Sequence, residues 1–221
     1  MTDTAPDQDP VARIPLTRQR VLVAAIQWAD ERGLESLSMR KLGQQLGVEA
    51  MSLYNHVANK DDMINGMIGI VIGEVSLANP AGEWREELRR TAQSVHDVYL
   101  AHPWVCDLVM KPVAITETRL RYMDSILGTL RAGGFSVRLT HHAYHALETH
   151  TLGFTMQQIS FDFDREELDT VGREFLSTLP DGFAHLAEHV HYHLAPEEPD
   201  KSGFDFGLDL ILDGLERMLN T

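Results

Sequence analysis

The chain has a single cysteine, Cys106, among 221 residues, and it has no long apolar run. One cysteine cannot form an intrachain disulfide, which excludes the small disulfide-stabilised folds and suits a reducing compartment. No segment approaches the roughly 18 consecutive apolar residues that a membrane-spanning helix needs. Residues 2–15 are polar and contain proline, which is not typical of a secretion signal. We therefore expect a cytoplasmic protein without a membrane partner.

Positive charge is also scarce. The chain has 19 Lys and Arg against 33 Asp and Glu, a formal net charge of -14. The deficit is uneven, because residues 16–60 carry six Lys or Arg against four Asp or Glu, while residues 61–221 carry 12 against 26. This pattern indicates a mildly basic end on an acidic body, so that only one face of the molecule attracts phosphate.

No useful stretch alternates apolar and polar residues with period two, so no strand is predicted. Apolar residues instead recur at helical spacing, which predicts an all-α fold. Residues 1–15 hold three Pro and three Asp and indicate a disordered arm. The Asn-Pro-Ala-Gly turn at 79–82 marks the expected boundary between a first domain at 16–79 and a second at 80–221. In the second domain we expect helices near 84–101, 115–131, 137–159, 166–178, 181–193 and 204–219.

Residues 38–60 have the pattern of a helix-turn-helix. Ser38 can accept a hydrogen bond from the amides of a first helical turn, and Gly47 ends that helix. A second short helix follows with Leu53 and Val57 facing inward. Two such helices fit a DNA major groove, where the N-terminal half of the second meets base edges. The residues left to point outward are Met51, Ser52, Tyr54, Asn55 and His56.

Two groups of histidines allow a different interpretation. The first lies on one helical face at i, i+4 and i+7 and could hold a metal ion: His141, His145 and Glu148. The second fits the His-x-x-Glu-His pattern of some zinc peptidases: His185, Glu188 and His189. A polar helix face explains the same residues, and nothing in the sequence supplies a peptidase domain. We therefore expect a protein that is not an enzyme. Two alternatives stay open, a metal-responsive regulator and a zinc hydrolase.

The helix-turn-helix resembles the tetracycline-repressor (TetR) family of bacterial transcription regulators, and especially the subgroup that contains tetracycline repressor. The resemblance lies in Ser-Met-Arg-Lys-Leu at 38–42, Leu-Gly-Val at 46–48, Leu-Tyr-Asn-His-Val at 53–57 and Asn-Lys at 59–60. The second domain is similar more faintly, in Gly-Phe-Ser at 134–136, in Thr-Leu-Gly at 151–153 and in the apolar pattern over 204–215.

This resemblance implies DNA-binding roles for matching residues. Arg40 would read a guanine edge, because its forked guanidinium matches O6 and N7. Asn55 and His56 would face the groove or its wall, and Met51 would press on a thymine methyl group. Packing within the domain is the alternative for Tyr54 and His56. Phosphate contacts are implied for Thr17, Ser38, Ser52, Tyr54 and Lys60.

The resemblance also implies a symmetric dimer, formed when two helices of each chain pair with those of its mate. The sequence offers separate support in an apolar face made of Phe204, Leu208, Ile211, Leu212, Leu215 and Leu219. Three glycines in the same helix would let two backbones approach closely: Gly203, Gly207 and Gly214. Glycine costs helix stability, so packing within one chain would not favour three of them.

An effector site is implied in the second domain, with no cofactor. Asp107 and Met110 replace the family's magnesium-holding His and a nearby Thr, which argues against a tetracycline-magnesium chelate. We expect a largely apolar organic effector with one or two polar anchors, whose binding releases a dimeric repressor from a palindromic operator. Any of these residues could equally belong to the core. The expected site residues are Thr91, Val95, Trp104, Asp107, Met110, Met123, Ile126, His141, Tyr144 and Gln157.

Overall fold

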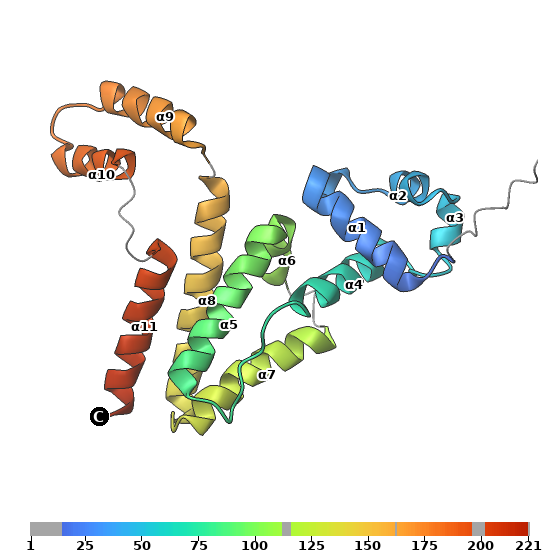
Figure 1. The fold of residues 1–221 in the computed structure, drawn as a ribbon, viewed down its shortest axis with the longest axis horizontal. Coiled ribbons are helices and arrows are strands. Elements are labelled where there is room, and N and C mark those ends of the chain that lie inside the picture. The colour runs from blue at the N-terminus through green and yellow to red at the C-terminus, as the bar shows by residue number, and fades with distance from the viewer. Residues whose placement is uncertain (1–14, 112–115, 162, 196–201, 221) are drawn as a thin grey trace, which may run out of the picture. The chain divides into compact units, whose positions relative to one another are not determined.

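The computed structural model describes residues 15–111, 116–161, 163–195 and 202–220. Within these ranges every regular element is a helix, which confirms the predicted all-α fold (Figure 1). The chain forms two compact units, residues 1–70 and 71–221. The predicted domain boundary at 79–80 and the predicted roles of the two domains stay predictions. All of the predicted disordered arm except Pro15 lies outside the described residues.

The first unit has a small helical core. In it α2 contacts both α1 and α3. The fourth helix begins in this unit and continues into the second. The side chains of the first unit with the least exposure are Val21, Ala25, Leu42, Leu53, Met63 and Met67. Its elements are α1 (Arg18–Arg32), η1 (Leu34–Ser36), α2 (Met39–Leu46), α3 (Ala50–Leu53) and α4 (Lys60–Ile72).

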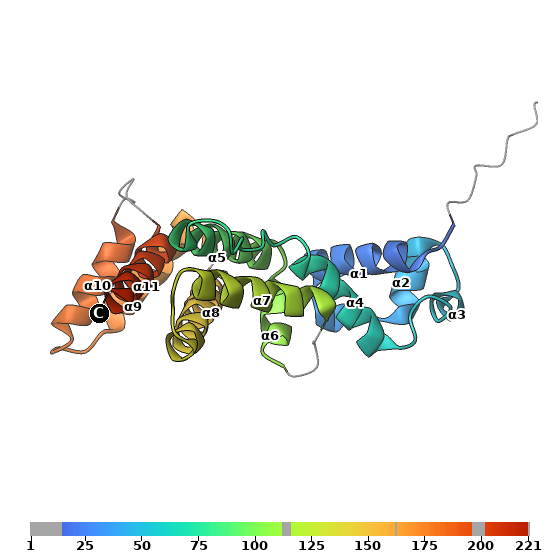
Figure 2. The ribbon, with the colours of Figure 1, turned by 90° about the horizontal axis from the view of Figure 1, so that it is seen from below.

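The second unit is built around a long helix. The helix α8 contacts α5, α7 and α11, and α5 also contacts α7 (Figures 1 and 2). Trp84 and Phe135 meet edge to face, with ring centroids 5.0 Å apart, and Phe135 is fully buried. These helices are α5 (Trp84–Ala101), η2 (Pro103–Val105), α6 (Cys106–Val109), α7 (Glu117–Ala132), α8 (Val137–Ser160) and α11 (Gly203–Leu219).

Ion pairs tie α5 to α11. Arg85 pairs with Asp213 and, at 3.2 Å, with Glu216. One helical turn further, Arg89 pairs with Asp209. One more turn along, the Gln93 amide donates to Asp205 at 2.8 Å. Polar partners thus recur every four residues on each helix, which fixes the register of α11 against α5.

The apolar face of α11 is buried within its own chain. Phe204, Leu208, Leu212 and Leu215 are all buried, so assigning these four to a dimer interface was wrong. Two glycines serve the same internal packing. A Cβ on Gly203 would lie 3.1 Å from the Phe154 ring, and one on Gly207 would lie 2.4 Å from the His150 ring. In contrast, a Cβ on Gly214 would meet nothing within 4 Å.

Two further helices form a hairpin, α9 (Arg165–Thr178) and α10 (Ala184–Leu194). Asp164 and Glu167 form a capping box at the start of α9. Gly172 is the one buried residue of the two helices, and a Cβ there would lie 2.7 Å from the Leu194 side chain. The pair therefore buries little apolar surface in one chain.

Candidate nucleic-acid interface and effector site

Two glycines set the geometry of the helix-turn-helix. Gly47 ends α2 in the left-handed region, with φ 69°, and its amide donates to the carbonyls of Gln44 and Gly43. Gly43 is needed for a different reason. A Cβ there would lie 2.8 Å from the Val48 carbonyl oxygen and 3.2 Å from the Ala50 nitrogen. Because Gly43 has no side chain, α2 and the start of α3 can approach closely.

Helix caps hold two of the predicted phosphate ligands in place. The Thr17 hydroxyl accepts from the Arg20 amide at 3.2 Å and begins α1. The Ser38 hydroxyl accepts from the Lys41 amide at 3.3 Å and begins α2. Both residues are exposed. Each therefore lies at a helix N-terminus, where free amides and the helix dipole favour a phosphate.

The outward side of α3 carries large side chains with no core to cover them. Met51 is 73% exposed, and Tyr54, which follows the last residue of α3, is 45% exposed, so part of its surface is open to a partner. Arg40 and Asn55 are exposed, and Arg40 makes no hydrogen bond or ion pair with any described residue. Ser52 and His56 are partly buried. These residues offer a forked cation, an amide, a phenol and a thioether to a partner surface.

An ion pair that the sequence analysis missed fixes the end of this face. The Arg18 guanidinium donates to both Asp62 oxygens, at 2.7 and 2.8 Å, and to the His56 carbonyl at 2.9 Å. The Ala58 amide also donates to Asp62, at 2.8 Å. The bonds from Arg18 and then from Ala58 lower the pKa of Asp62 to about 2. The pair joins the first turns of α1 and α4 to the segment after α3, and no local sequence signal links residues 44 positions apart.

Lys60, another predicted phosphate ligand, is exposed and lies at the first residue of α4. Its amine donates to the Leu37 carbonyl at 3.4 Å, beside the start of α2. A lysine amine has three donors, so this contact leaves two for another partner.

The predicted effector residues are not brought together on one surface. Val95, Trp104 and Ile126 are buried, and buried Thr91 donates to the Ser76 carbonyl at 3.0 Å. Met123 and Tyr144 are partly buried. Four others are exposed: Asp107, Met110, His141 and Gln157.

The structure reveals a polar cluster inside the second unit instead. Tyr122 is buried and donates to the Glu148 carboxyl group, which Tyr144 also hydrogen-bonds. Arg119 lies near enough to act on Glu148, and it donates to the Val109 carbonyl at 2.5 Å. Burial raises the pKa of Glu148, against the effect of these three neighbours. Burial likewise raises the pKa of Tyr99.

This cluster has the chemistry of a polar anchor in an otherwise apolar site, because it holds acceptors, hydroxyl donors and a cation together. One signal for it was present in the sequence, since Tyr144 and Glu148 lie at i and i+4 of one helix. Tyr122 and Arg119 come from α7, and their approach depends on packing of α7 on α8. Sequence spacing alone does not reveal that approach.

The alternative of a metal-binding face on α8 is not supported by the described residues. Glu148 bonds to Tyr122, while His141 and His145 are exposed and meet edge to face, with ring centroids 4.6 Å apart. In the described part of the chain, no three His, Cys, Asp or Glu side chains are placed to hold a metal ion. His185 lies 3.9 Å from Glu188, and both side chains are highly exposed, unlike the enclosed site of a zinc peptidase.

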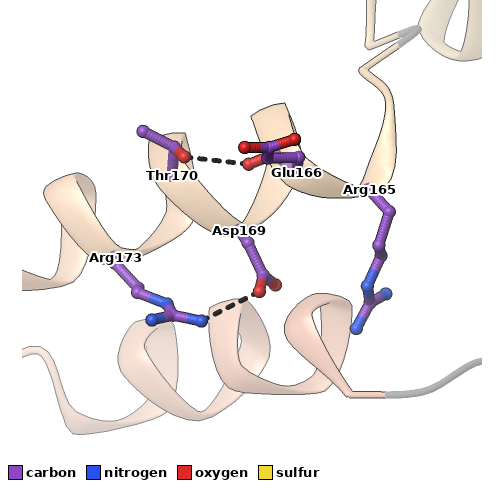
Figure 3. Close-up of a pocket in the computed structure, with 5 residues that line it drawn as sticks. All are labelled: Arg165, Glu166, Asp169, Thr170 and Arg173. Atoms are coloured by element: carbon purple, nitrogen blue, oxygen red, sulfur yellow. Dashed lines mark hydrogen bonds and ion pairs between the residues drawn. The ribbon is translucent and has the colours of Figure 1, made fainter.

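An open pocket of about 570 Å³ lies along α9 (Figure 3). Arg173 pairs with Asp169 at 2.9 Å, and Arg165 donates to the Leu194 carbonyl. Both arginines and Asp169 thus have partners within the hairpin, so we do not assign the effector to this pocket. It is lined by Arg165, Glu166, Asp169, Thr170 and Arg173.

No helix among the described residues is both long enough and apolar enough to cross a bilayer.

Comparisons with known proteins cover both units. Residues 21–67 match the family model described as bacterial regulatory proteins, tetR family. Residues 78–219 match the model described as tetracyclin repressor-like, C-terminal domain.

The chain is similar over most of its length to the HTH-type transcriptional repressor Rv1353c of Mycobacterium tuberculosis. Identity is 27% over 219 residues, covering 90% of this chain and 80% of that protein. It is 30% identical to tetracycline repressor protein class D of Escherichia coli over 152 residues, covering 65% of this chain and 66% of the repressor. The crystal structure of the Streptomyces coelicolor protein ActR in complex with actinorhodin has a TM-score of 0.75 and 27% identity, covering 94% of this chain and all of ActR.

Proposed function

The chain belongs to the TetR family of transcriptional regulators, which are not enzymes, and from this premise we propose a repressor that binds a palindromic operator as a dimer and is released by an organic effector. The observation that carries the proposal is the exposed side of α3 with Arg40 beside it. A DNA groove would give the exposed Met51 and Tyr54 base edges and phosphates to contact.

Binding to the DNA that flanks the protein's own gene tests the DNA-binding residues. Fluorescence anisotropy would compare the wild type with Arg40→Ala at several salt concentrations. A bidentate contact to guanine is worth about 1–3 kcal/mol, so we expect affinity to fall by about 5- to 150-fold for each of the two half-sites that the dimer contacts. Arg121→Ala is the control, because Arg121 is an exposed body residue paired with Glu117. Equal affinity for Arg40→Ala and the wild type would contradict the assigned role.

The helices α8 and α11 contact each other within one chain. We base the dimer on the faces of these two helices that remain exposed. Each face combines apolar or small residues at helical spacing with one glycine whose missing Cβ faces open space, Gly153 on α8 and Gly214 on α11. Two helix backbones can approach closely where a glycine has no side chain, so packing of a second copy here would explain both glycines. On α8 the face holds Ala146, Thr149, Gly153 and Met156, and on α11 it holds Phe206, Leu210, Gly214 and Met218.

We place the polar anchor of the effector at Glu148, Tyr122, Tyr144 and Arg119. The solved ActR complexes with actinorhodin and with (S)-DNPA, at 27% and 28% identity to this chain, support an organic effector. Such a ligand would act by favouring the state whose two DNA-binding units do not fit the operator. The helix α4 supplies the covalent connection, since it runs from the first unit into the second.

Glu148→Gln tests this anchor while keeping its shape. A panel of aromatic organic compounds would first be screened for release of operator DNA from the wild type. For active compounds, loss of a hydrogen bond to a charged group should weaken the response by about 10- to 100-fold. Glu117→Gln is the matched control, because Glu117 is an exposed carboxylate of α7. Unchanged release by all active compounds would exclude Glu148 as the anchor.

A further inference from the structure

The function proposed above makes no use of the histidines of α10. This helix carries four of them within 11 residues: His185, His189, His191 and His193. Three of them, His185, His189 and His193, follow one another at intervals of four residues on one side of the helix, and the last two are in close contact. The Nε2 atoms of His189 and His193 lie 3.2 Å apart, and their rings meet edge to face, with centroids 4.6 Å apart and planes at 85°.

The separation of these two nitrogens fits joint coordination of one metal ion. Imidazole nitrogens bind zinc at about 2.0–2.1 Å, so two nitrogens 3.2 Å apart would subtend an angle of about 100° at the metal. That angle lies between the right angle of square-planar or octahedral geometry and the tetrahedral angle. From this geometry we propose that His189 and His193 form a bidentate site for a divalent transition-metal ion such as Zn²⁺, Ni²⁺ or Cu²⁺.

The other α10 histidines have different partners. His191 Nδ1 lies 2.6 Å from the Ala187 carbonyl oxygen, which holds that ring against the helix backbone. His185 faces Glu188 instead, at 3.9 Å. On α8, His141 and His145 make the same kind of ring contact, but no hydrogen bond joins their ring nitrogens. Among the described histidines, the nitrogens of His189 and His193 are therefore the ones that converge.

The location of the pair also suits a cation. His193 lies in the last turn of α10, where the helix dipole favours positive charge, and His189 lies one turn before it. Both side chains are exposed, so water can fill the remaining coordination positions. No described side chain joins the pair to make a three-ligand group. A site with two protein ligands and open positions binds reversibly rather than as a permanent structural centre.

Metal binding at i and i+4 would link successive turns of α10 and would require the helix to be folded. A ligand that binds only the folded helix stabilises it by mass action. The hairpin buries almost no side chains in one chain, so this stabilisation should be most evident there.

Titration calorimetry of the full chain tests the proposal, using protein purified without a histidine tag and freed of metal with a chelator. Zinc, nickel and copper chlorides would be titrated separately. Nitrogen ligands should bind copper more tightly than nickel or zinc, and magnesium should show no binding at this site. We expect His189→Gln and His193→Gln each to weaken binding of one equivalent of metal at least tenfold.

His185→Gln and His191→Gln are matched controls, because each removes one histidine from the same exposed helix, and both should bind within twofold of the wild type. Hydrogen exchange gives a second readout: zinc should slow amide exchange in α10 of the wild type but not of His189→Gln. Unchanged affinity in both pair variants would overturn the proposal. Equal losses in the pair variants and the controls would also overturn it, because the histidines would then act without a defined geometry.

Discussion

Arg18 and Asp62 show how one ion pair can position the residues around α3, which form the surface that we propose for DNA binding. Arg18 bonds to the His56 carbonyl and to Asp62, so it connects the residues after α3 to the start of α4. Both side chains are partly exposed, at 45% and 32%. Solvent therefore screens the pair, and it should contribute about 1 kcal/mol to folding. Its larger effect is on the position of α3.

We predict that Asp62→Asn weakens operator binding although Asp62 is not a proposed DNA contact, because Arg18 would no longer be held in place. The expected loss is several-fold, measured by anisotropy. Asp61→Asn is the control, because it removes the same charge from the neighbouring exposed position. If the two variants bind alike, net charge rather than the ion pair determines the affinity.

The same pair predicts a pH dependence of stability. The pKa of Asp62 falls from 3.8 to about 2 in the folded chain. Its contribution is therefore complete above about pH 4 and is lost as the pH falls toward 2. In denaturant unfolding, the stability difference between the wild type and Asp62→Asn should shrink over this interval. A difference that stays constant from pH 5 to pH 2.5 would contradict the assignment.

Sequence reasoning succeeded for residues whose role is local. Ser38 and Gly47 cap α2 as predicted, because the groups they bond lie within three or four positions of them. It missed the Arg18–Asp62 and Tyr122–Glu148 contacts, which join residues far apart in the chain. Periodicity shows which residues turn inward, but it does not show which polar side chains meet there.

At the scale of helices, the periodic pattern predicted bounds well. The helix expected at 84–101 spans Trp84–Ala101, and the one expected at 137–159 spans Val137–Ser160. The partner of a helical face was harder to predict. The apolar stripe of α11 was correctly recognised as a buried face but was assigned to a second chain instead of to its own. Apolar spacing is the same in both cases, so only the three-dimensional structure distinguishes them.

The close approach of α2 and α3 predicts a large effect for Gly43→Ala. The added carbon would overlap the Val48 carbonyl, which is backbone and cannot rotate away. We expect the stability of the DNA-binding unit to fall by about 1–3 kcal/mol, measured by denaturant unfolding. Gln44→Ala, on the exposed side of the same helix, should change stability little. Equal stability of the two variants would mean that α2 and α3 can separate at no cost.

The proposed dimer face predicts that Leu210→Asp separates the two chains. Leu210 is 57% exposed, so the substitution should not disturb the core of one chain. Sedimentation velocity should show a monomer with unchanged helicity and much weaker operator binding. Leu120→Asp is the control, since Leu120 is 52% exposed on α7. A dimer that tolerates Leu210→Asp would place the interface elsewhere.

At the scale of the whole molecule, the chain has a net charge of -14 and yet belongs to a DNA-binding family. The few cations of the first unit must therefore supply the phosphate contacts. We predict that Lys60→Ala lowers the magnitude of the slope of log K against log salt by about 2 for a dimer, one unit for each chain. An unchanged slope would show that the Lys60 amine does not contact phosphate. Thermal unfolding would check that loss of its bond to Leu37 leaves the fold intact.

The packing of α11 has a consequence for how the chain could be divided. Its ion pairs to α5 and its two glycines against Phe154 and His150 specify where this helix docks and in which register. The α11 residues that make all of these contacts lie within 17 residues. A synthetic peptide of residues 203–219 should therefore complement a fragment of residues 1–195 in trans, as the two parts of a split reporter do. A repressor divided in this way would be inactive until a second, very short gene supplied the peptide.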